Sequence, residues 1–342
     1  MRKAKAAYST ARVPKTAMKT LLPNARKPNP GDLVLAEIIH LHKHKRIELC
    51  NGRRAHLSPG DIVILCYGNR YAPDQFEAYV PEDLSPCHMV AAGGVAARVK
   101  NKHSEVGQPT EIKPLGLIGN EAGKPFNLKD WALPKQPLPQ GLPPIFAVTG
   151  TTMNSGKTTT AACLIQGLSR SGMRVDAAKV TGTGAGGDVW HMHDMGAAEA
   201  VDFTSAGFAS TFGLFLDDLE YIFDLLIGHL CSKEVDAIVL EIADGIYQRE
   251  TAALLSSPLF VSRVEAILFA AKDAMGAKAG IDWLQSKNLH VSGVSGAMTA
   301  SPMAVEEASQ VIALPILDAK QLSSSDIGSL FFPSKQRQPH VG

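Results

Sequence analysis

The pattern of apolar and polar positions changes near residue 145. From Gly31 to about residue 130, short apolar runs alternate with turn residues, and the tripeptide Pro-Gly-Asp precedes two runs of β-branched residues. Hardly any of this part has the 3.6-residue period of an amphipathic helix. The pattern therefore predicts a small all-β domain over residues 31–130, either a barrel or a sandwich.

Beyond Ile145, runs of Val, Ile, Leu and Ala alternate with helical patterns. We expect strands at residues 145–149, 173–180, 235–243, 264–271, 289–296 and 313–317, and helices at 157–170, 217–230, near 251, 277–287 and 303–311. Strands that are apolar on both faces indicate a mostly parallel sheet that helices cover on both faces. The fold class predicted for residues 145–325 is therefore α/β.

The segments outside these two domains are rich in proline or in charge. Five prolines between residues 134 and 144 favour an extended backbone, so we predict a linker over residues 131–144. The first 31 residues hold eight Lys or Arg and no acid, which predicts a basic disordered tail over residues 1–30. Residues 326–342 are predicted to form a C-terminal tail.

Composition narrows the classes of function. Beyond residue 31 the chain holds 26 basic and 33 acidic residues, and this mildly acidic body argues against nucleic-acid binding. No apolar run approaches the ~20 residues that cross a bilayer, so no membrane association is expected. Five cysteines without a Cys-x-x-Cys pair favour a reduced, cytoplasmic protein. The sequence does not determine the oligomeric state, and a homodimer is one alternative.

The first predicted strand of the α/β domain runs into the sequence GTTMNSGKTTT, which a helical pattern follows. This order of strand, glycine-containing loop and helix is typical of a P-loop, where backbone N–H groups bind the phosphates of a nucleotide. Lys157 is expected to reach the β and γ phosphates, and the Thr158 hydroxyl is expected to ligate Mg²⁺. The predicted nucleotide-binding residues are Gly150, Thr151, Asn154, Ser155, Gly156, Lys157, Thr158 and Thr159.

The spacing inside this loop resembles one class of P-loop proteins. Five residues separate Gly150 from Gly156, one more than in a standard Walker A loop, and the sequence reads VTGTTMNSGKTTT. It is similar to the loop of the dethiobiotin synthetase-like class of P-loop NTPases. The similarity covers about residues 145–317 and implies that class's P-loop NTPase fold.

The resemblance also implies roles for residues beyond the loop. Lys179 closes the second predicted strand, 22 residues after Lys157, where the family has a lysine that contacts the substrate carboxylate and the reacting groups. Glu241 stands where the family's third strand carries a glutamate, and it is expected to hold Mg²⁺ or to take a proton. An acidic residue downstream of the second strand helps to hold Mg²⁺ in the family, and Asp188 or Asp194 could fill that place.

The chain departs from this family in three ways. Ser295 or a neighbour stands where the family has an asparagine that recognises adenine, so GTP is not excluded beside ATP. Thr151 replaces the signature lysine of the related partitioning ATPases, which disfavours a dimeric switch that depends on this lysine. The family has no β-domain ahead of its P-loop, so we do not interpret the chain as dethiobiotin synthetase itself.

The stretch KVTGTGAGGDVWHMHD, from Lys179 to Asp194, follows the second strand and contains four glycines. We expect it to form a mobile substrate or switch loop beside the γ phosphate. Lys179, His191, His193 and Asp194 are candidates for binding an anionic substrate. A transition-metal site at His191, His193 and Asp194 is the alternative, although a complete site needs a further ligand that the sequence does not indicate.

Other polar residues follow the later strands. Asp244, Arg249 and Glu250 come after the third strand, and Lys272 and Asp273 come after the fourth. Each could line the pocket at the carboxyl ends of the strands. The alternatives are an ion pair of Arg249 with Glu250 at a helix start, and solvation of Lys272 and Asp273.

Three histidines of the β-domain, His40, His42 and His44, recur at every second residue. On one strand they would share a face. We interpret this face as solvated rather than metal-binding, because no carboxylate or cysteine stands nearby in the sequence to complete a ligand set.

Two functions follow from these patterns. The first is a Mg²⁺-dependent enzyme, an ATP-dependent ligase or kinase for a small carboxylate- or amine-bearing molecule, with Lys157, Lys179 and Glu241 as catalytic residues and Thr158, Asp188 and Glu241 as metal ligands. The second is a nucleotide-dependent switch or accessory NTPase whose β-domain docks a partner protein.

Overall fold

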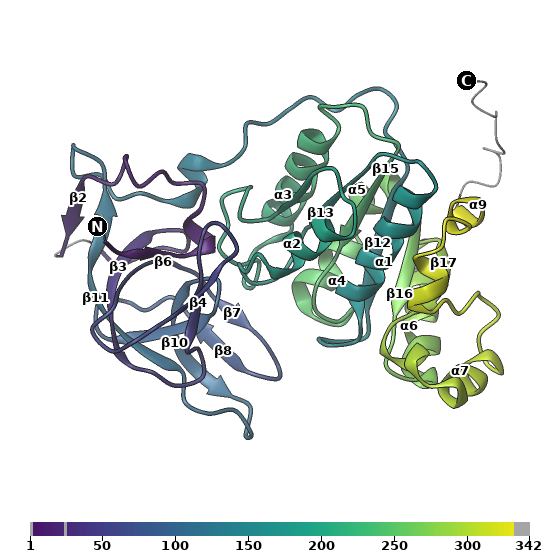
Figure 1. Cartoon of the computed structure of the whole chain (residues 1–342), viewed down its shortest axis with the longest axis horizontal. Coiled ribbons are helices and arrows are strands. Elements are labelled where there is room, and N and C mark those ends of the chain that lie inside the picture. Colours follow the sequence, from purple (N-terminus) through teal and green to yellow (C-terminus); the bar gives the residue numbers. More distant parts are fainter. Residues whose placement is uncertain (1–2, 24–25, 332–342) are drawn as a thin grey trace. The chain divides into compact units, whose positions relative to one another are not determined.

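The computed structural model describes residues 3–23 and 26–331 (Figure 1). The chain divides into two compact units. The first comprises Met1–Lys135, Thr181–Asp188 and Asp202–His229, and the second comprises Gln136–Val180, Val189–Val201 and Leu230–Gly342. Two segments of the sequence beyond Ile145, Thr181–Asp188 and Asp202–His229, therefore belong with the β-domain. The contiguous domains expected from the sequence are corrected here, because periodicity identifies an element but not the neighbours that it packs against.

The core of the first unit is a closed β-barrel rather than a sandwich. Its strands are β3 (Leu33–His40), β6 (Ile62–Tyr67), β9 (Cys87–Ala91), β10 (Val95–Lys102) and β11 (Thr110–Gly119). They pair in the order β6-β3-β11-β9-β10, and a parallel pairing of β10 with β6 closes the ring. Closure leaves no unpaired edge among these five strands.

Shorter elements extend the barrel. They are β1 (Lys5–Ala6), η1 (Tyr8–Thr10), β2 (Thr20–Leu22), β7 (Arg70–Tyr71), β8 (Phe76–Tyr79) and η2 (Leu128–Trp131), and β4 (Arg46–Glu48) pairs with β5 (Arg54–His56) as a separate hairpin. Alternate residues of β6 enter two different apolar clusters, Val63 and Leu65 in one and Ile64 and Cys66 in the other. Both faces of this strand are thus buried, which explains its continuous apolar run.

The prediction of a disordered tail over residues 1–30 is wrong for the described part of that segment. Strand β1 pairs in parallel with β6, Lys5 opposite Val63, and β2 pairs with β11. Ala7, Val13 and Met18 are buried. The sequence concealed this because the apolar residues here are small and isolated, so they form no periodic pattern.

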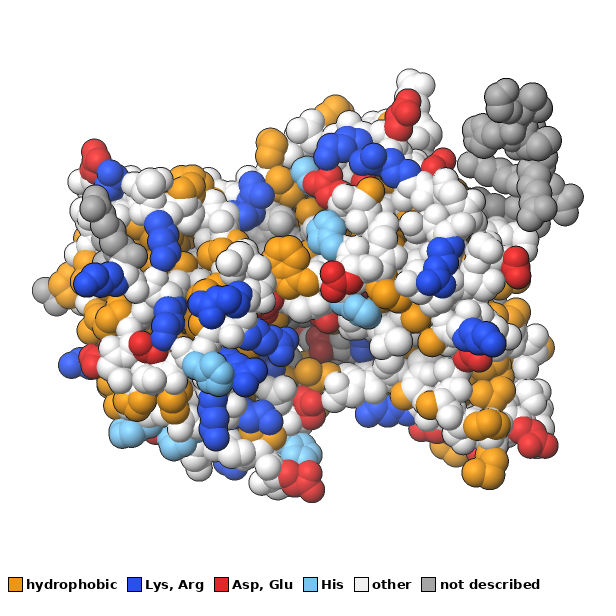
Figure 2. All heavy atoms as spheres, viewed as in Figure 1, with side chains coloured by type: hydrophobic (Ala, Val, Ile, Leu, Met, Phe, Trp, Pro, Cys, Tyr) orange, Lys and Arg blue, Asp and Glu red, His pale blue; other side chains and the backbone are white. Residues whose placement is uncertain are grey.

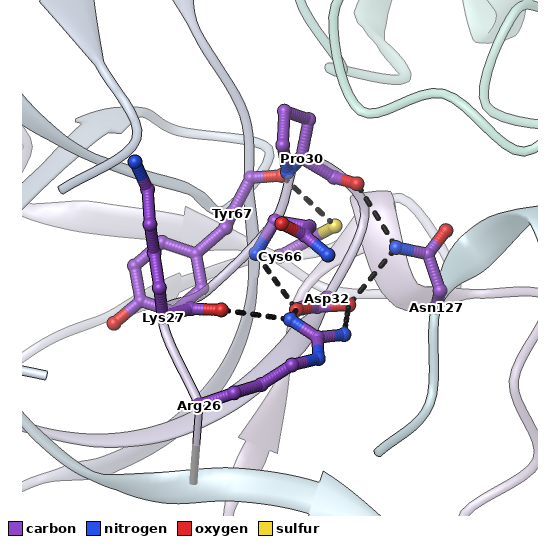
Figure 3. A network of polar contacts seen from close by, with 8 residues as sticks. Arg26, Lys27, Pro30, Asp32, Cys66, Tyr67 and Asn127 are labelled. Atoms are coloured by element: carbon purple, nitrogen blue, oxygen red, sulfur yellow. Dashed lines mark hydrogen bonds and ion pairs between the residues drawn. The ribbon is translucent and has the colours of Figure 1, made fainter. Parts of the chain in front are cut away.

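A buried carboxylate fixes the end of this N-terminal segment to the barrel (Figure 3). Asp32 is fully buried, and both its oxygens accept hydrogen bonds from the Arg26 guanidinium, at 2.7 and 3.2 Å. The Asn127 side-chain amide donates to the same carboxylate at 2.9 Å and to the Pro30 carbonyl at 2.9 Å. A buried charge is tolerated when it is paired and hydrogen-bonded in this way.

The second unit is built on a parallel sheet in the order β14-β13-β15-β12-β16-β17. The strands are β12 (Ile145–Gly150), β13 (Val175–Lys179), β14 (Ala200–Asp202), β15 (Ala237–Glu241), β16 (Ala266–Ala270) and β17 (Val291–Ser295), and each pairing that joins β13, β15, β12, β16 and β17 is parallel. Residues 313–317 were expected to form a strand but make a single bridge, Val294 with Ile316.

The helices are α1 (Lys157–Arg170), α2 (Gly187–Asp194), α3 (Leu216–Leu230), α4 (Arg249–Leu255), α5 (Pro258–Arg263), α6 (Ala274–Ser286), η3 (Ala297–Ala300), α7 (Pro302–Ser309), α8 (Ala319–Leu322) and α9 (Ile327–Phe331). The five predicted helices are present as α1, α3, α4, α6 and α7, whereas α2, α5, α8 and α9 were not predicted. All of α3 except Leu230 belongs to the first unit, and α2 begins in the first unit and ends in the second. No helix within the described residues is long and apolar enough to span a membrane.

Helices cover both faces of the parallel sheet. On one face, α1 packs against β12, β13, β15 and β16, and Leu164 and Leu168 join the apolar cluster of Val148 and Val239. On the other, α6 lies so close that a Cβ atom on Gly280 would be 2.1 Å from the Phe269 ring. This arrangement confirms the predicted α/β layers.

The C-terminal elements also pack on this unit. The Phe331 ring lies edge-on to Phe146, with 4.8 Å between ring centroids, and Ile327 is buried. The predicted tail over 326–342 is therefore wrong for residues 326–331, because Ile327 and Phe331 supply apolar surface to the face of α1. Residues 332–342 lie outside the described part.

Candidate phosphate-binding site

The loop between β12 and α1 approaches its neighbours too closely for larger residues. A Cβ atom on Gly150 would lie 2.5 Å from the Ala270 carbonyl oxygen and 2.5 Å from the Ser155 hydroxyl. Gly156, the N-cap of α1, has φ of 98°, and Asn154 has φ of 61°. Left-handed backbone of this kind favours glycine and tolerates asparagine. The residue types of the predicted loop are therefore those that its backbone requires.

Ser155 lies at the centre of this loop and is fully buried. Its hydroxyl oxygen is buried, and among the described residues it has no hydrogen-bond partner. Leaving a buried polar group unsatisfied costs about 1–3 kcal/mol. An anion at the N-terminus of α1 would accept a hydrogen bond from this hydroxyl, in the position where the helix dipole favours negative charge. The loop thus fits the phosphate group that its sequence predicts.

Three side chains contact one another next to the loop, and Lys157 contacts the loop backbone. The Lys157 ammonium donates to the Thr152 carbonyl at 2.8 Å. The Thr158 hydroxyl donates to Glu241 Oε1 at 3.0 Å, and Lys179 Nζ lies 3.7 Å from the same oxygen. The exposed fractions of the Lys179 and Glu241 side chains are 12% and 2%, so this pair is shielded from water. The structure thereby brings together Thr158, Lys179 and Glu241, which lie far apart in the sequence.

The sheet explains why these residues meet. Strand β15 lies between β12 and β13, and its register places Glu241 beside both Val148 and Lys179. The carboxyl ends of the three strands therefore reach the same edge of the sheet, where open α/β sheets bind their ligands. A hydroxyl and a carboxylate at this edge are oxygen ligands of the kind that Mg²⁺ prefers. Thr158 and Glu241 are therefore the residues that would hold a Mg²⁺ ion at this edge.

Backbone from three neighbouring loops supports the phosphate loop. Ile246 donates its N–H to the Gly150 carbonyl at 3.1 Å, Thr151 donates to Ala270 at 3.0 Å, and Ala297 donates to Ser155 at 2.8 Å. Two glycines permit this approach. A Cβ atom on Gly245 would lie 2.4 Å from the Thr151 carbonyl oxygen, and one on Gly296 would lie 2.4 Å from that of Ser155.

We expect Gly245→Ala to weaken nucleotide binding about tenfold, or ~1.4 kcal/mol, because the Thr151 carbonyl must move and displace the loop amides. Titration with a fluorescent nucleotide measures this. Gly141→Ala is the matched control, because a Cβ atom there would meet nothing within 4 Å. Equal affinities of the two variants would contradict the supporting role of Gly245.

Sequence reasoning missed Gly245 and Gly296. Each glycine stands within four residues of the end of a strand, at Glu241 and at Ser295. A lone glycine at such a place is the signal that could have found them, because it marks close approach of another backbone.

The residues predicted downstream of Lys179 are separated by the division into units. Asp188, at the start of α2, belongs to the first unit, and its role in Mg²⁺ binding stays a prediction. His191, His193 and Asp194 belong to the second unit, where His193 Nδ1 lies 3.3 Å from the Ala197 carbonyl. Among the described residues, no three His, Cys, Asp or Glu are placed to hold a metal ion, so the transition-metal alternative finds no support.

The glycine-rich segment forms several backbone hydrogen bonds. Gly184 donates its N–H to the Ala209 carbonyl at 2.8 Å, and the Thr211 N–H donates to the Gly182 carbonyl at 2.9 Å. The Gly186 N–H donates to the buried Glu48 carboxylate at 3.1 Å. These bonds lie within the first unit, and residues Gly187–Asp194 form α2, so the stretch is not one continuous loop; its mobility stays a prediction.

Two of the other candidates, Asp273 and Glu250, have structural roles. Asp273 caps α6 by accepting the Gly276 N–H at 2.6 Å. Glu250 is buried, and its ion pair with Arg249, at 2.6 Å, is the pairing expected at a helix start. Asp244 has φ of 65° in the loop that supports Thr151. Lys272 is exposed.

The three barrel histidines do not share a face. His40 Nδ1 lies 2.9 Å from the Glu111 carboxylate, and His42 Nε2 lies 3.9 Å from the same carboxylate. The His44 ring instead packs near Phe76, and its burial lowers the pKa of His44 to about 4. The chain leaves β3 at His40, which ends the alternation that the sequence suggested.

Comparisons with known proteins leave the family open. No family model and no curated protein matches the chain. The cell division protein FtsY of Thermotoga maritima shares 15% identity over 58% of this chain and 71% of that chain, with a TM-score of 0.37. The signal recognition particle receptor FtsY of Elizabethkingia anophelis shares 14% identity over 58% of this chain and 68% of that chain, also with a TM-score of 0.37. The structure of that receptor in complex with GDP shares 15% identity over 60% of this chain and 68% of that chain, and its TM-score is also 0.37. Similarity this low supports no conclusion about activity.

Proposed function

We propose that this chain is a Mg²⁺-dependent nucleoside triphosphatase that acts on the terminal phosphoryl group of a bound nucleotide. One observation is the main support. The hydroxyl of Thr158, directly after the phosphate-loop lysine, is hydrogen-bonded to Glu241, which also lies beside Lys179 at the carboxyl edge of the sheet. Phosphoryl transfer needs chiefly positioning and stabilisation of charge, and this set of groups supplies both.

Each residue has a distinct part in the proposal. The backbone of residues 151–156 and the Ser155 hydroxyl bind phosphate oxygens, and Lys157 leaves the Thr152 carbonyl to contact the β and γ phosphates. Thr158 and Glu241 hold Mg²⁺, which when bound neutralises phosphate charge. Lys179 places its ammonium where a γ phosphate or a substrate carboxylate would carry negative charge.

The finer proposal is an ATP-dependent ligase or kinase for a small molecule. The shielded Lys179 ammonium suits a carboxylate or carbamate substrate, because a salt bridge is stronger where water is excluded. ATP is the expected nucleotide. GTP is kept as the alternative because residues 296–300, after β17, contain no asparagine that would recognise adenine.

A nucleotide-dependent switch is the second candidate, and one observation favours it. Thr181–Asp188 follows Lys179 almost directly in the chain, yet it belongs to the unit that contains the barrel. A change of conformation at Lys179 would pass along the backbone into that unit.

Phosphate release from ATP and GTP, measured with a panel of small carboxylates and amines, tests the proposal. We expect at least one compound to stimulate turnover, and Lys179→Ala to lose about 10- to 100-fold of the stimulated rate. Lys278→Ala is the control, because this exposed lysine of α6 pairs with Asp282.

Three other outcomes are informative. If no compound stimulates turnover and Lys179→Ala equals wild type, the ligase and kinase proposal is wrong. Slow basal turnover without stimulation would then favour the switch. If neither nucleotide binds, the proposal of a nucleoside triphosphatase fails as a whole.

A further inference from the structure

Positive charge is concentrated on one part of the barrel unit. We define the basic hairpin as residues 43–56, which contain β4 and β5 and five exposed basic side chains: Lys43, Lys45, Arg46, Arg53 and Arg54. Figure 2 shows Lys and Arg side chains gathered on the first unit, around the position of β4. The mildly acidic average of the sequence conceals this concentration.

The five cations have no acidic partner. None of them forms an ion pair or a side-chain hydrogen bond with a described residue. Elsewhere in the same unit exposed cations do have carboxylate partners, for example Lys27 with Glu82, Lys100 with Glu77 and Lys129 with Asp218. Carboxylates thus neutralise several exposed cations elsewhere in the unit, whereas the basic hairpin groups five cations that have no such partner within the described residues.

Strand register places the charges outward. Arg46 pairs with His56 and Glu48 with Arg54, while Ile47 pairs with Ala55. Since neighbouring residues of a strand point to opposite faces, Ile47 and Ala55 face the core and are buried. Arg46, Glu48, Arg54 and His56 share the other face, on which Arg46, Arg54 and His56 are exposed and Glu48 is buried.

The single acid of the basic hairpin does not offset this charge at the surface. Glu48 is only 1% exposed, and its carboxylate accepts the Gly186 N–H at 3.1 Å. Glu48 Oε2 is thus directed toward backbone of the same unit. An approaching anion meets five exposed cations and no exposed carboxylate that belongs to the basic hairpin.

We propose that the basic hairpin binds the phosphodiester backbone of nucleic acid without reading its sequence. Guanidinium groups match phosphate oxygens with pairs of N–H donors, and three of the five cations are arginines. Phosphate contacts provide affinity that does not depend on base identity. This inference goes beyond the proposed nucleotide chemistry and does not depend on it.

Other anionic partners fit the hairpin less well. Residues 43–56 contain no Phe, Tyr or Trp, so no side chain can stack on a base. The exposed large apolar residues of the described chain include none from the hairpin, although a membrane-inserting surface or the centre of a protein interface needs them. Recognition by charge and hydrogen bonding alone is what a phosphate backbone requires.

Fluorescence anisotropy with the full chain and a labelled 30-nucleotide RNA or DNA of mixed sequence tests this inference. We expect binding at about 50 mM salt. The logarithm of the association constant should fall linearly with the logarithm of the salt concentration, with a slope of about 0.7–0.9 for each phosphate contacted. The double variant Arg53→Gln/Arg54→Gln should reduce this slope by about 1–2 and weaken binding at least tenfold.

The matched control removes two paired cations of the same unit, Lys27→Gln/Lys100→Gln, and should change binding less than threefold. Phosphate release by both double variants should equal that of wild type, which separates this inference from the proposed function. Three results would overturn it: no binding at 50 mM salt, an equal loss in the control, or competition by poly-glutamate or anionic vesicles as effective as that by nucleic acid.

Discussion

Replacing Lys157 with alanine is expected to weaken nucleotide binding about 100-fold or more. The lysine is 6% exposed and lies at the first position of α1, with its ammonium already directed back over the loop to Thr152. Truncating one partner of a shielded, charge-assisted hydrogen bond costs ~2–5 kcal/mol, and each 1.4 kcal/mol is a factor of ten in affinity. Isothermal titration with Mg-ATP and Mg-GTP measures the change.

Two further variants show whether the lost charge is the cause. Lys157→Met keeps most of the side-chain volume and should lose affinity to the same degree, while Lys278→Ala removes an exposed lysine and should not. Thermal unfolding confirms that each variant is folded. If folded Lys157→Met binds both nucleotides as tightly as wild type, the loop does not bind nucleotide phosphates as we propose.

Replacing Glu241 with glutamine is expected to lower turnover about 100- to 1000-fold while the protein stays folded. The change keeps the shape of the side chain and a hydrogen-bond acceptor for Thr158, but it removes the charge that faces Lys179 and would hold Mg²⁺. Loss of one well-placed electrostatic group in a shielded site costs ~3–4 kcal/mol of transition-state stabilisation. Phosphate release as a function of Mg²⁺ concentration measures both the rate and the metal dependence.

The control for this change is Glu234→Gln, which alters an exposed glutamate of the same unit. A Mg²⁺ dependence that shifts to higher concentration in Glu241→Gln alone would support metal binding by the carboxylate. A mutant with wild-type turnover and unchanged Mg²⁺ dependence would remove Glu241 from the catalytic set.

The sequence alone was sufficient to predict a P-loop because the residues of that motif are contiguous. Glycines at 150 and 156 and the Lys-Thr pair stand at spacings that one strand, one turn and one helix impose, so no long-range information is needed. Lys179 and Glu241 came from the ends of predicted strands and from a family resemblance. The contact between Lys179 Nζ and Glu241 Oε1 depends on the order of strands in the sheet, in which β15 lies between β12 and β13.

What the sequence left open and what it predicted wrongly have a common origin. Barrel and sandwich stayed alternatives because the choice depends on the pairing of β10 with β6, whose paired residues lie about 30 positions apart in sequence. The N-terminal segment resembled a tail because its apolar residues show no period, although β1 pairs with β6. The hydrogen bonds of the glycine-rich segment were not predicted because the partners of its N–H groups, Glu48 and Ala209, are distant in the chain.

Local information therefore determined the longer helices and strands and the parallel layers of the second unit, and it sufficed to predict a P-loop. Those properties depend on periodicity and turn chemistry within short stretches. Only the tertiary structure decided the closure of the barrel, the assignment of Thr181–Asp188 to the first unit and the outward, unpaired charges of the basic hairpin. Each of these depends on which distant segments bury one another's apolar surface and hydrogen-bonding groups. Neither composition nor local pattern specifies which segments pair in this way.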